Sequence, residues 1–368
     1  MGRGAELERL TAALDRARHG AGGLVLLSGE AGVGKTRLTA ALADGAPDAW
    51  VLHGAALHPG TTPYGPAVAA LRTALRRDTA ALRGCGPLAP HLAVVLPELG
   101  EPAAGTDRAT LLEAFRCALA HLAADRVVLV VLEDLHWSDE ATLELLRALA
   151  EPLGEHAVLV LATYRSEGLP RDHGLRRLRH ELRRAGLLDE VTLRPLDPDG
   201  TAELVAEVLG APAAPALARL VHDATQGTPF FARELAAALQ AGGALRDGPR
   251  GLEPAALGEL PLPETVRDAV LVNVAELSPE GRAAAEAAAV AGQAFDLELV
   301  GELSSAAGAA ELVERGLVRE TGDGRGAFPH ALTREALYAD VPWLRRRRLH
   351  RALAEAAERA GEPSVVVA

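Results

Sequence analysis

The stretch that decides the fold is Gly29-Glu30-Ala31-Gly32-Val33-Gly34-Lys35-Thr36. It follows the apolar run Leu24-Val25-Leu26-Leu27-Ser28 and precedes Arg37-Leu38-Thr39-Ala40-Ala41-Leu42, whose residues suit a helix. A buried strand, a glycine turn and a helix in this order give the pattern G-x-x-x-x-G-K-[ST] the structural context of a phosphate-binding loop. We therefore expect an α/β fold built around this loop.

The expected loop binds phosphate mainly through its backbone. Its glycines allow a tight turn in which successive N–H groups point into one concavity. The following helix adds its N-terminal donors and the positive end of its dipole. Lys35 is expected to reach the β- and γ-phosphates of a nucleotide, and the Thr36 hydroxyl to bind Mg²⁺. The expected nucleotide-binding residues of this region are Gly29, Glu30, Ala31, Gly32, Val33, Gly34, Lys35, Thr36 and Arg37.

A chance match is the alternative, because the chain contains 37 glycines. Lys35, however, is the only lysine, and every other residue among the 38 lysines and arginines is an arginine. The chain also has no isoleucine and a single asparagine, Asn273, which suggests a G+C-rich genome that has replaced AT-rich codons elsewhere. The planar guanidinium of arginine cannot replace a compact ammonium in such a loop, so the retained lysine favours phosphate binding.

Length and charge limit the class of protein. The 368 residues predict two or three domains. A formal net charge of −12 argues against a large nonspecific nucleic-acid surface, although it leaves room for a local basic patch. Cys85 and Cys117 lack the spacing of a metal site and are expected to be thiols in a reducing compartment. With neither a signal peptide nor an apolar run near the roughly 18 residues of a membrane span, we expect a soluble, cytoplasmic protein with no membrane partner.

The first half of the chain alternates apolar strand patterns with helical patterns. Such an alternation predicts a parallel sheet with helices on both faces. The expected strands are residues 24–28, 50–54, 127–132, 158–162 and 191–193. The expected helices are residues 4–19, 37–42, 110–124, 139–150 and 171–185, with a further helix around Leu71, a loop at 58–66, and only short helical pieces in 84–105.

After Pro195 we expect the strands of the sheet to stop. Residues 198–242 contain three helical patterns, and the Gly- and Pro-rich segment 242–263 is expected to be a linker. Several short helices and a hairpin around residues 317–328 are typical of a winged helix. The predicted domains are a P-loop nucleotide-binding domain at 1–195, a helical lid at 196–258, a winged helix at 259–342, and a C-terminal helix and tail at 343–368.

Polar residues follow three of the expected strands, at the edge where parallel sheets bind ligands. They are the loop after Leu27, the acids Glu133 and Asp134, and Thr163-Tyr164-Arg165. We expect Glu133, Asp134 and Lys35 to be catalytic, with Thr36, Glu133 and Asp134 around Mg²⁺ and one carboxylate orienting a water molecule. The alternative for the acids is the plain start of a loop. Arg165 either donates to the γ-phosphate or is a surface arginine.

Four motifs together resemble a known class of proteins. They are Gly29–Thr36, Glu133-Asp134-Leu135-His136-Trp137-Ser138-Asp139, Ala162-Thr163-Tyr164-Arg165 and Gly227-Thr228-Pro229-Phe230-Phe231. The combination resembles the STAND class of AAA-like signalling ATPases, and more narrowly the ATPase core of the large ATP-binding regulators of the LuxR family. The resemblance implies an α/β P-loop NTPase followed by a helical lid and a winged helix. It also implies a switch between an ADP-bound closed state and an ATP-bound assembled state, with slow ATP hydrolysis.

The same resemblance implies three further contacts to the nucleotide. Arg3, in the opening Gly2-Arg3, would lie beside the adenine, and Pro229 would pack on the base. His330 would sense the β-phosphate of ADP, although a lone histidine is more often structural. The chain departs from the family at Glu133, where many members have Asp, so either Glu133 or Asp134 could be nearer Mg²⁺. The family's C-terminal helical repeats and helix-turn-helix domain are also missing from the sequence.

Three functions are compatible with these features. The favoured one is an ATP-binding signalling switch, the core of a transcriptional regulator, which self-associates in the ATP state and answers to an unidentified inducer or regulatory protein. The second is an initiator-like ATPase whose winged helix binds DNA; the acidic charge disfavours direct DNA binding, since Arg345–Arg348 is the only compact basic run. A metabolic phosphotransferase would need an acceptor site, for which the sequence gives no residues.

Overall fold

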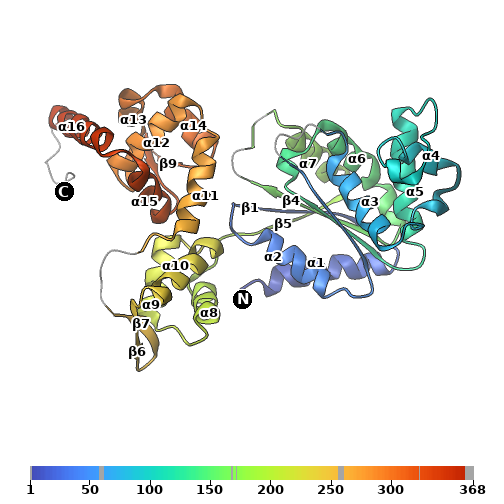
Figure 1. The fold of residues 1–368 in the computed structure, drawn as a ribbon, viewed down its shortest axis with the longest axis horizontal. Coiled ribbons are helices and arrows are strands. Elements are labelled where there is room, and N and C mark those ends of the chain that lie inside the picture. The colour runs from blue at the N-terminus through green and yellow to red at the C-terminus, as the bar shows by residue number, and fades with distance from the viewer. Residues whose placement is uncertain are drawn as a thin grey trace. The chain divides into compact units, whose positions relative to one another are not determined.

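The computed structural model describes residues 2–57, 62–166, 169–170, 172–255, 261–322 and 324–360, with side chains to residue 356. Parts of the predicted loop at 58–66, the linker at 242–263, the hairpin turn and the C-terminal tail lie outside the described residues. The chain divides into two compact units (Figure 1). One consists of Arg3–Arg194, and the other of residues 195–368 together with residues 1–2.

A five-stranded sheet forms the centre of the unit Arg3–Arg194. Its strands lie in the order β2-β3-β4-β1-β5, and every neighbouring pair is parallel. The strands are β1 (Gly23–Gly29), β2 (Trp50–Ala55), β3 (Val128–Glu133), β4 (Val158–Arg165) and β5 (Leu188–Thr192). All five were predicted, and the prediction of a parallel sheet is confirmed.

Helices cover both faces of this sheet (Figure 1). Leu24 and Leu26 of β1 join the core beneath α3, α5, α6 and α7, whereas Val25 and Leu27 join the core beneath α1 and α2. Alternate residues of a strand point to opposite faces, so a continuous apolar run is needed when both faces are buried. The helices are α1 (Gly4–Arg18), α2 (Lys35–Asp44), α3 (Gly65–Arg77), α4 (Ala89–Leu92), α5 (Arg108–Leu122), α6 (Glu140–Ala150) and α7 (Gly174–Ala185).

The register of the strands brings their carboxyl ends level. Gly29 of β1 pairs with Arg165 of β4, and Leu132 of β3 pairs with Ala162 of β4. β4 therefore continues to Arg165, three residues beyond its predicted end at Ala162, because β1 still offers backbone partners there. The result places the phosphate loop, the acid pair and Arg165 at one edge of the sheet.

The second unit begins with three helices, as predicted, but the segment predicted to be a linker contains two strands. A hairpin of β6 (Leu245–Gly248) and β7 (Gly251–Pro254) lies inside the segment predicted to be a linker. Gly251 has a φ of 113°, and the carbonyl of Pro212 accepts a hydrogen bond from the N–H of Leu252 at 2.8 Å. Glycine and proline here form a tight turn rather than a linker. The three helices are α8 (Pro198–Leu209), α9 (Pro215–Thr225) and α10 (Pro229–Ala241).

The rest of the second unit packs helices around a small antiparallel sheet of order β8-β10-β9. The predicted hairpin corresponds to β9 and β10, and β8 was not predicted. The elements are α11 (Glu264–Ala275), α12 (Pro279–Ala291), β8 (Ala294–Asp296), α13 (Leu297–Leu303), α14 (Ala306–Glu314), β9 (Arg319–Gly322), β10 (Arg325–Ala327), α15 (Ala331–Asp340) and α16 (Trp343–Ala360). No helix among the described residues is both long and apolar enough to cross a membrane.

Gly54 of β2 provides a test of how closely α3 packs on the sheet. A Cβ at this position would lie 1.9 Å from the carbonyl oxygen of Pro66, at the start of α3. We expect Gly54→Ala to lower the free energy of unfolding by about 1–3 kcal/mol, because backbone must move to admit one methyl group. Gly23→Ala is the matched control, since nothing lies within 4 Å of a Cβ at Gly23. Urea unfolding measures both, and equal stability of the two variants would contradict the close approach.

Candidate nucleotide site

The loop between β1 and α2 has the backbone that its glycines predict. Gly32 and Gly34 have φ values of 73° and 101°, in the left-handed region that residues with a side chain rarely adopt. Gly34 is also the N-cap residue, immediately before the first residue of α2. A Cβ on Gly29 would lie 2.8 Å from the carbonyl oxygen of Leu193, so β5 closes against the start of the loop. The first turn of α2, with Thr36 and Arg37 exposed, continues directly from this turn.

Lys35 is the first residue of α2, and its side chain folds back over the loop. Its Nζ donates to the carbonyl oxygens of Gly29 at 2.9 Å and Glu30 at 2.8 Å. The residue is only 9% exposed, which is rare for lysine and requires such partners. The ammonium is therefore fixed at the end of β1, where the loop begins.

Two acidic residues, Glu133 and Asp134, lie at the carboxyl end of β3, which is separated from β1 by β4. Glu133 is the last residue of β3, and its Oε1 is buried without a hydrogen-bond partner among the described residues. Asp134 has a φ of 58°, a left-handed conformation that Asp tolerates better than most residues. The N–H of Asp134 donates to the hydroxyl of Thr163 on β4 at 3.1 Å. A buried oxygen without a hydrogen-bond partner, next to a residue with a left-handed backbone, is a combination that is common at functional sites.

His136 connects the acid pair at the end of β3 to the end of β4. Its Nδ1 accepts the backbone N–H of Arg165 at 3.4 Å and lies 3.8 Å from Oδ1 of Asp134, while its side chain is 8% exposed. Burial, and then the positive charges of Arg165, Lys35 and His173, lower the pKa of His136 to about 3. The ring is neutral near pH 7. The sequence motif contains His136, but only the structure indicates that its ring lies between the end of β3 and the end of β4.

Arg3 ties the loop to the end of the first unit. Its guanidinium donates to the carbonyl oxygen of Val33 at 3.2 Å and to that of Arg194 at 2.5 Å, and it pairs with Glu6 at 3.3 Å. These contacts occupy the guanidinium with loop and strand-end backbone. A contact of Arg3 with an adenine remains a prediction.

Pro229 and His330 belong to the other unit. Pro229 opens α10, and His330 precedes α15. The Nε2 of His330 lies 3.4 Å from the hydroxyl of Thr228, and its ring meets the ring of Phe231 edge-on, with 4.9 Å between centroids. The structure thus brings the two motifs of this unit together. Whether they approach the nucleotide remains a prediction.

The described residues contain no group of three His, Cys, Asp or Glu side chains close enough to hold a metal ion by themselves. A cation at the edge of the sheet would therefore need other ligands. Glu133 fits such a role, because its orphan Oε1 offers an oxygen, and the exposed Thr36 at the helix start offers a hydroxyl. Oxygen ligands of this kind suit Mg²⁺, which usually keeps water and phosphate oxygens as its other ligands.

A parallel sheet that carries a glycine loop, a buried lysine at the helix start and acids at the end of another strand on the same edge defines a P-loop nucleotide hydrolase. Residues 1–161 match the AAA ATPase domain family. The protein is accordingly an ATPase, and the match to this family lies almost wholly in its first unit. Among curated proteins, none matches the chain.

Solved structures with a related fold include a Walker-type ATPase of Pyrococcus abyssi. It has a TM-score of 0.58 and 13% identity, and the match covers 91% of this chain and 95% of that one. A STAND protein with a tetratricopeptide repeat sensor from Pyrococcus horikoshii has a TM-score of 0.41 and 15% identity, over 99% of this chain and 46% of that one. A RuvB variant of Thermotoga maritima has a TM-score of 0.44 and 16% identity, over 93% and 96%. Scores below 0.5 do not establish a shared fold.

The position of Lys35 leads to a first test of the site. We expect Lys35→Ala to abolish measurable binding of ATP and ADP in calorimetric titrations, because the chain has no other lysine. Lys35→Arg should also bind weakly, since the charge is kept but a planar guanidinium cannot take the place of the compact Nζ. Arg184→Ala, which removes an exposed charge from α7, is the control. Undiminished affinity in Lys35→Ala would contradict the assignment of the loop.

Proposed function

We propose that this ATPase is a nucleotide-operated signalling switch of the STAND class, with ATP or ADP and Mg²⁺ as cofactors. In this proposal it is the regulatory core of a LuxR-type transcriptional regulator and hydrolyses ATP slowly. The observation that carries the proposal is the buried ring of His136, whose Nδ1 accepts the backbone N–H of Arg165 at 3.4 Å and lies 3.8 Å from Oδ1 of Asp134. Such a ring connects the end of β3 to the end of β4, so a displacement of one strand end alters the other.

The chemistry follows from the roles that these side chains can take. The loop backbone and Lys35 bind the phosphates, and Thr36 with Glu133 or Asp134 binds Mg²⁺, which neutralises charge on the phosphates when bound. The second carboxylate of the pair orients the attacking water. Arg165, half-buried at the end of β4, donates to the γ-phosphate and reports its presence.

The switch requires the second unit to respond to the nucleotide. In the proposal, α8 to α10 act as a lid whose Pro229 packs on the base, and residues 259–342 act as a winged helix whose His330 reads the β-phosphate of ADP. ADP then favours a closed monomer, and ATP favours an open form that self-associates. An inducer or regulatory protein of unknown identity would shift this balance, because it needs only a different affinity for the two states.

The initiator-like alternative, in which the winged helix binds DNA, has less support. Two arginines of the only compact basic run are engaged within the unit: Arg345 pairs with Glu286 at 3.0 Å, and the guanidinium of Arg346 lies 5.0 Å from the ring centroid of Tyr338. These contacts dock α16 rather than present a free basic face. The proposal also keeps a cytoplasmic location, which the free thiols of Cys85 and Cys117 favour.

The acid pair gives the test of hydrolysis. We expect Glu133→Gln and Asp134→Asn to bind ATP but to lose most phosphate release under saturating ATP, because binding comes mainly from the loop and water activation needs a carboxylate. Asn also tolerates the left-handed backbone at position 134. Asp139→Asn, in the same motif, is the control, since Asn caps α6 about as well as Asp does. Wild-type rates in both acid variants would place the metal site elsewhere.

The switch itself is tested by the ratio of ATP to ADP affinity. We expect Arg165→Ala to weaken ATP more than ADP and His330→Ala to weaken ADP more than ATP, because each residue reads a different phosphate. A tenfold change in the ratio corresponds to about 1.4 kcal/mol, within reach of one charge-assisted hydrogen bond. His222→Ala, which removes a histidine bonded to Thr201 at 3.0 Å in the same unit, is the control.

Light scattering with each nucleotide follows the size of the particle in the same experiment. The proposal expects a larger particle with ATP than with ADP, and expects Arg165→Ala to reduce that difference. If both variants keep the wild-type affinity ratio and the particle size ignores the nucleotide, the chain is an ATPase but not a switch of this kind.

A further inference from the structure

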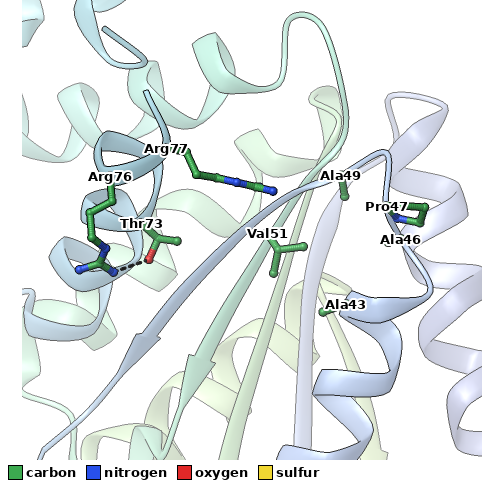
Figure 2. A pocket seen from close by; sticks show the side chains of 8 residues that line it. All are labelled: Ala43, Ala46, Pro47, Ala49, Val51, Thr73, Arg76 and Arg77. Atoms are coloured by element: carbon green, nitrogen blue, oxygen red, sulfur yellow. Dashed lines mark hydrogen bonds between the residues drawn. The ribbon is translucent and has the colours of Figure 1, made fainter. Parts of the chain in front are cut away.

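A pocket of about 450 Å³ lies beside β2 (Figure 2). β2 is the edge strand that two strands, β3 and β4, separate from β1 and its phosphate loop. The lining of the pocket comes from two sides of the sheet. The end of α2 and the turn that follows it contribute small apolar residues, α3 contributes polar and basic residues, and β2 runs between them. The lining residues are Ala43, Ala46, Pro47, Ala49, Val51, Thr73, Arg76 and Arg77.

The backbone of β2 offers free hydrogen-bonding groups at this pocket. The N–H groups of Trp50 and Ala56 donate to Val127 and Glu133, both at 2.9 Å, so even-numbered residues of this strand face β3. The N–H and C=O of Val51 therefore face outward, because alternate residues of a strand point their backbone groups in opposite directions. Within the described part of the chain, no group outside the sheet hydrogen-bonds the backbone of Val51. The next outward-facing residue, His53, is partly covered, because its carbonyl accepts a hydrogen bond from the Thr73 hydroxyl of α3 at 3.2 Å. The open part of the edge, where an added strand can pair, is therefore at Val51.

Two guanidinium groups on α3 face the pocket without an acidic partner among the described residues. Arg76 is exposed and donates to the hydroxyl of Thr73 at 3.1 Å. Arg77 extends toward the strand, with its guanidinium 5.4 Å from the ring centroid of Trp50 (Figure 2). The nearby Arg72, by contrast, pairs with Glu98 at 2.6 Å. The pocket therefore has uncompensated positive charge, in a chain whose net charge is −12.

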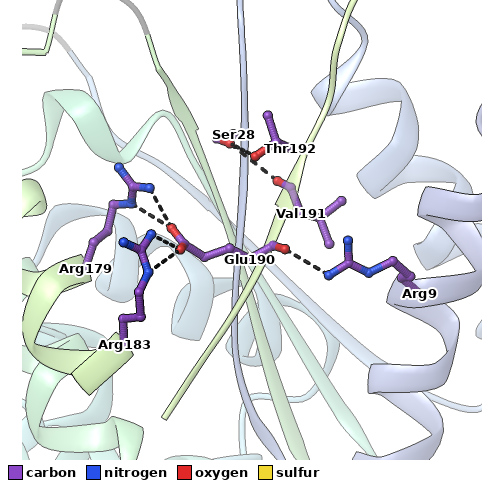
Figure 3. Close-up of polar contacts among 7 residues, drawn as sticks. All are labelled: Arg9, Ser28, Arg179, Arg183, Glu190, Val191 and Thr192. Carbon is purple, nitrogen blue, oxygen red and sulfur yellow. Dashed lines mark hydrogen bonds and ion pairs between the residues drawn. The ribbon is translucent and has the colours of Figure 1, made fainter. Parts of the chain in front are cut away.

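The opposite edge of the sheet is covered at Glu190. The outward carbonyl of Glu190 on β5 accepts a hydrogen bond from Arg9 of α1 at 2.9 Å. The carboxylate of Glu190 binds Arg179 and Arg183 of α7 on its other side (Figure 3). Side chains that bind outward backbone groups are one way in which proteins protect an edge strand. On β2 the His53 carbonyl has such a partner in Thr73, whereas the backbone of Val51 has none among the described residues.

We propose that the edge of β2 binds an extended acidic segment of another protein, which adds a strand next to β2. The side chains of an added strand alternate between the two faces of the sheet. On the α2 face they would meet Ala43, Ala46 and Ala49, and on the α3 face they would meet Arg76 and Arg77. The site therefore selects a segment in which small apolar residues alternate with Glu or Asp. This interaction surface is independent of the nucleotide chemistry proposed above.

A designed peptide provides the probe. A fluorescein-labelled, end-blocked peptide with the sequence Val-Glu-Val-Glu-Val-Glu is titrated with the full chain, and binding is followed by fluorescence anisotropy. We expect saturable binding that weakens with salt, and no binding of the matching Val-Lys peptide. The double variant Arg76→Gln/Arg77→Gln should weaken binding by about fivefold, as expected for loss of two exposed ion pairs. Arg72→Gln, which removes an arginine already paired with Glu98, should leave the affinity unchanged.

Backbone pairing is tested separately from charge. A Val-Glu peptide with N-methyl groups on alternate residues cannot pair with β2 along the methylated edge, and it should lose binding. Val51→Pro should have the same effect, since proline removes only the outward N–H and is tolerated on edge strands. Equal binding of the methylated peptide, full competition by free glutarate, or unchanged binding in the double arginine variant would each overturn the proposal. So would self-association of the chain that is abolished by Val51→Pro, because the edge would then pair with a second copy.

Discussion

The parallel ladder that joins β3, β4 and β1 is the constraint on which the rest of the first unit depends. Its hydrogen bonds set Gly29 opposite Arg165 and Leu132 opposite Ala162. A slip of one residue would turn every side chain of a strand to the other face, which both apolar cores forbid. Backbone geometry and burial thus fix where the polar residues after the strands can lie, before any of them contacts a ligand.

The site concentrates the unfavourable features of this unit. Glu133 has a buried oxygen without a partner, Asp134 holds a left-handed backbone, and His136 is buried with its pKa lowered to about 3. Each feature costs stability, and such costs persist only where the surrounding structure fixes the backbone. The apolar strands on both sides supply that rigidity. An arrangement that is poor for stability but charged and rigid suits the stabilisation of a reacting phosphate.

The sequence was sufficient for the loop, the five parallel strands and the strand-end acids, because glycine spacing and continuous β-branched runs are local signals. The sequence was insufficient where a strand or a side-chain contact depends on residues far away in the chain. Arg165 extends β4 because Gly29 offers pairing, and β7 forms because Pro212 accepts from Leu252. Arg3 contacts the carbonyl oxygens of Val33 and Arg194, which no local pattern specifies. The roles of Pro229 and His330 toward a nucleotide rest on the resemblance alone. The contacts of His330 with Thr228 and Phe231 do not specify these roles.

The single lysine gives this protein an uncommon chemical property. Apart from an α-amino group, the chain has one primary amine, and it lies at the phosphate loop with 9% of its surface exposed. Reagents that acylate amines react with the uncharged, accessible form, so hydrogen bonds from Nζ to Gly29 and Glu30 protect it. Acylation of the lysine therefore reports a single change, the release of Nζ from the carbonyl oxygens of the loop. Mass spectrometry of the intact protein could count that event directly, without a background from other lysines.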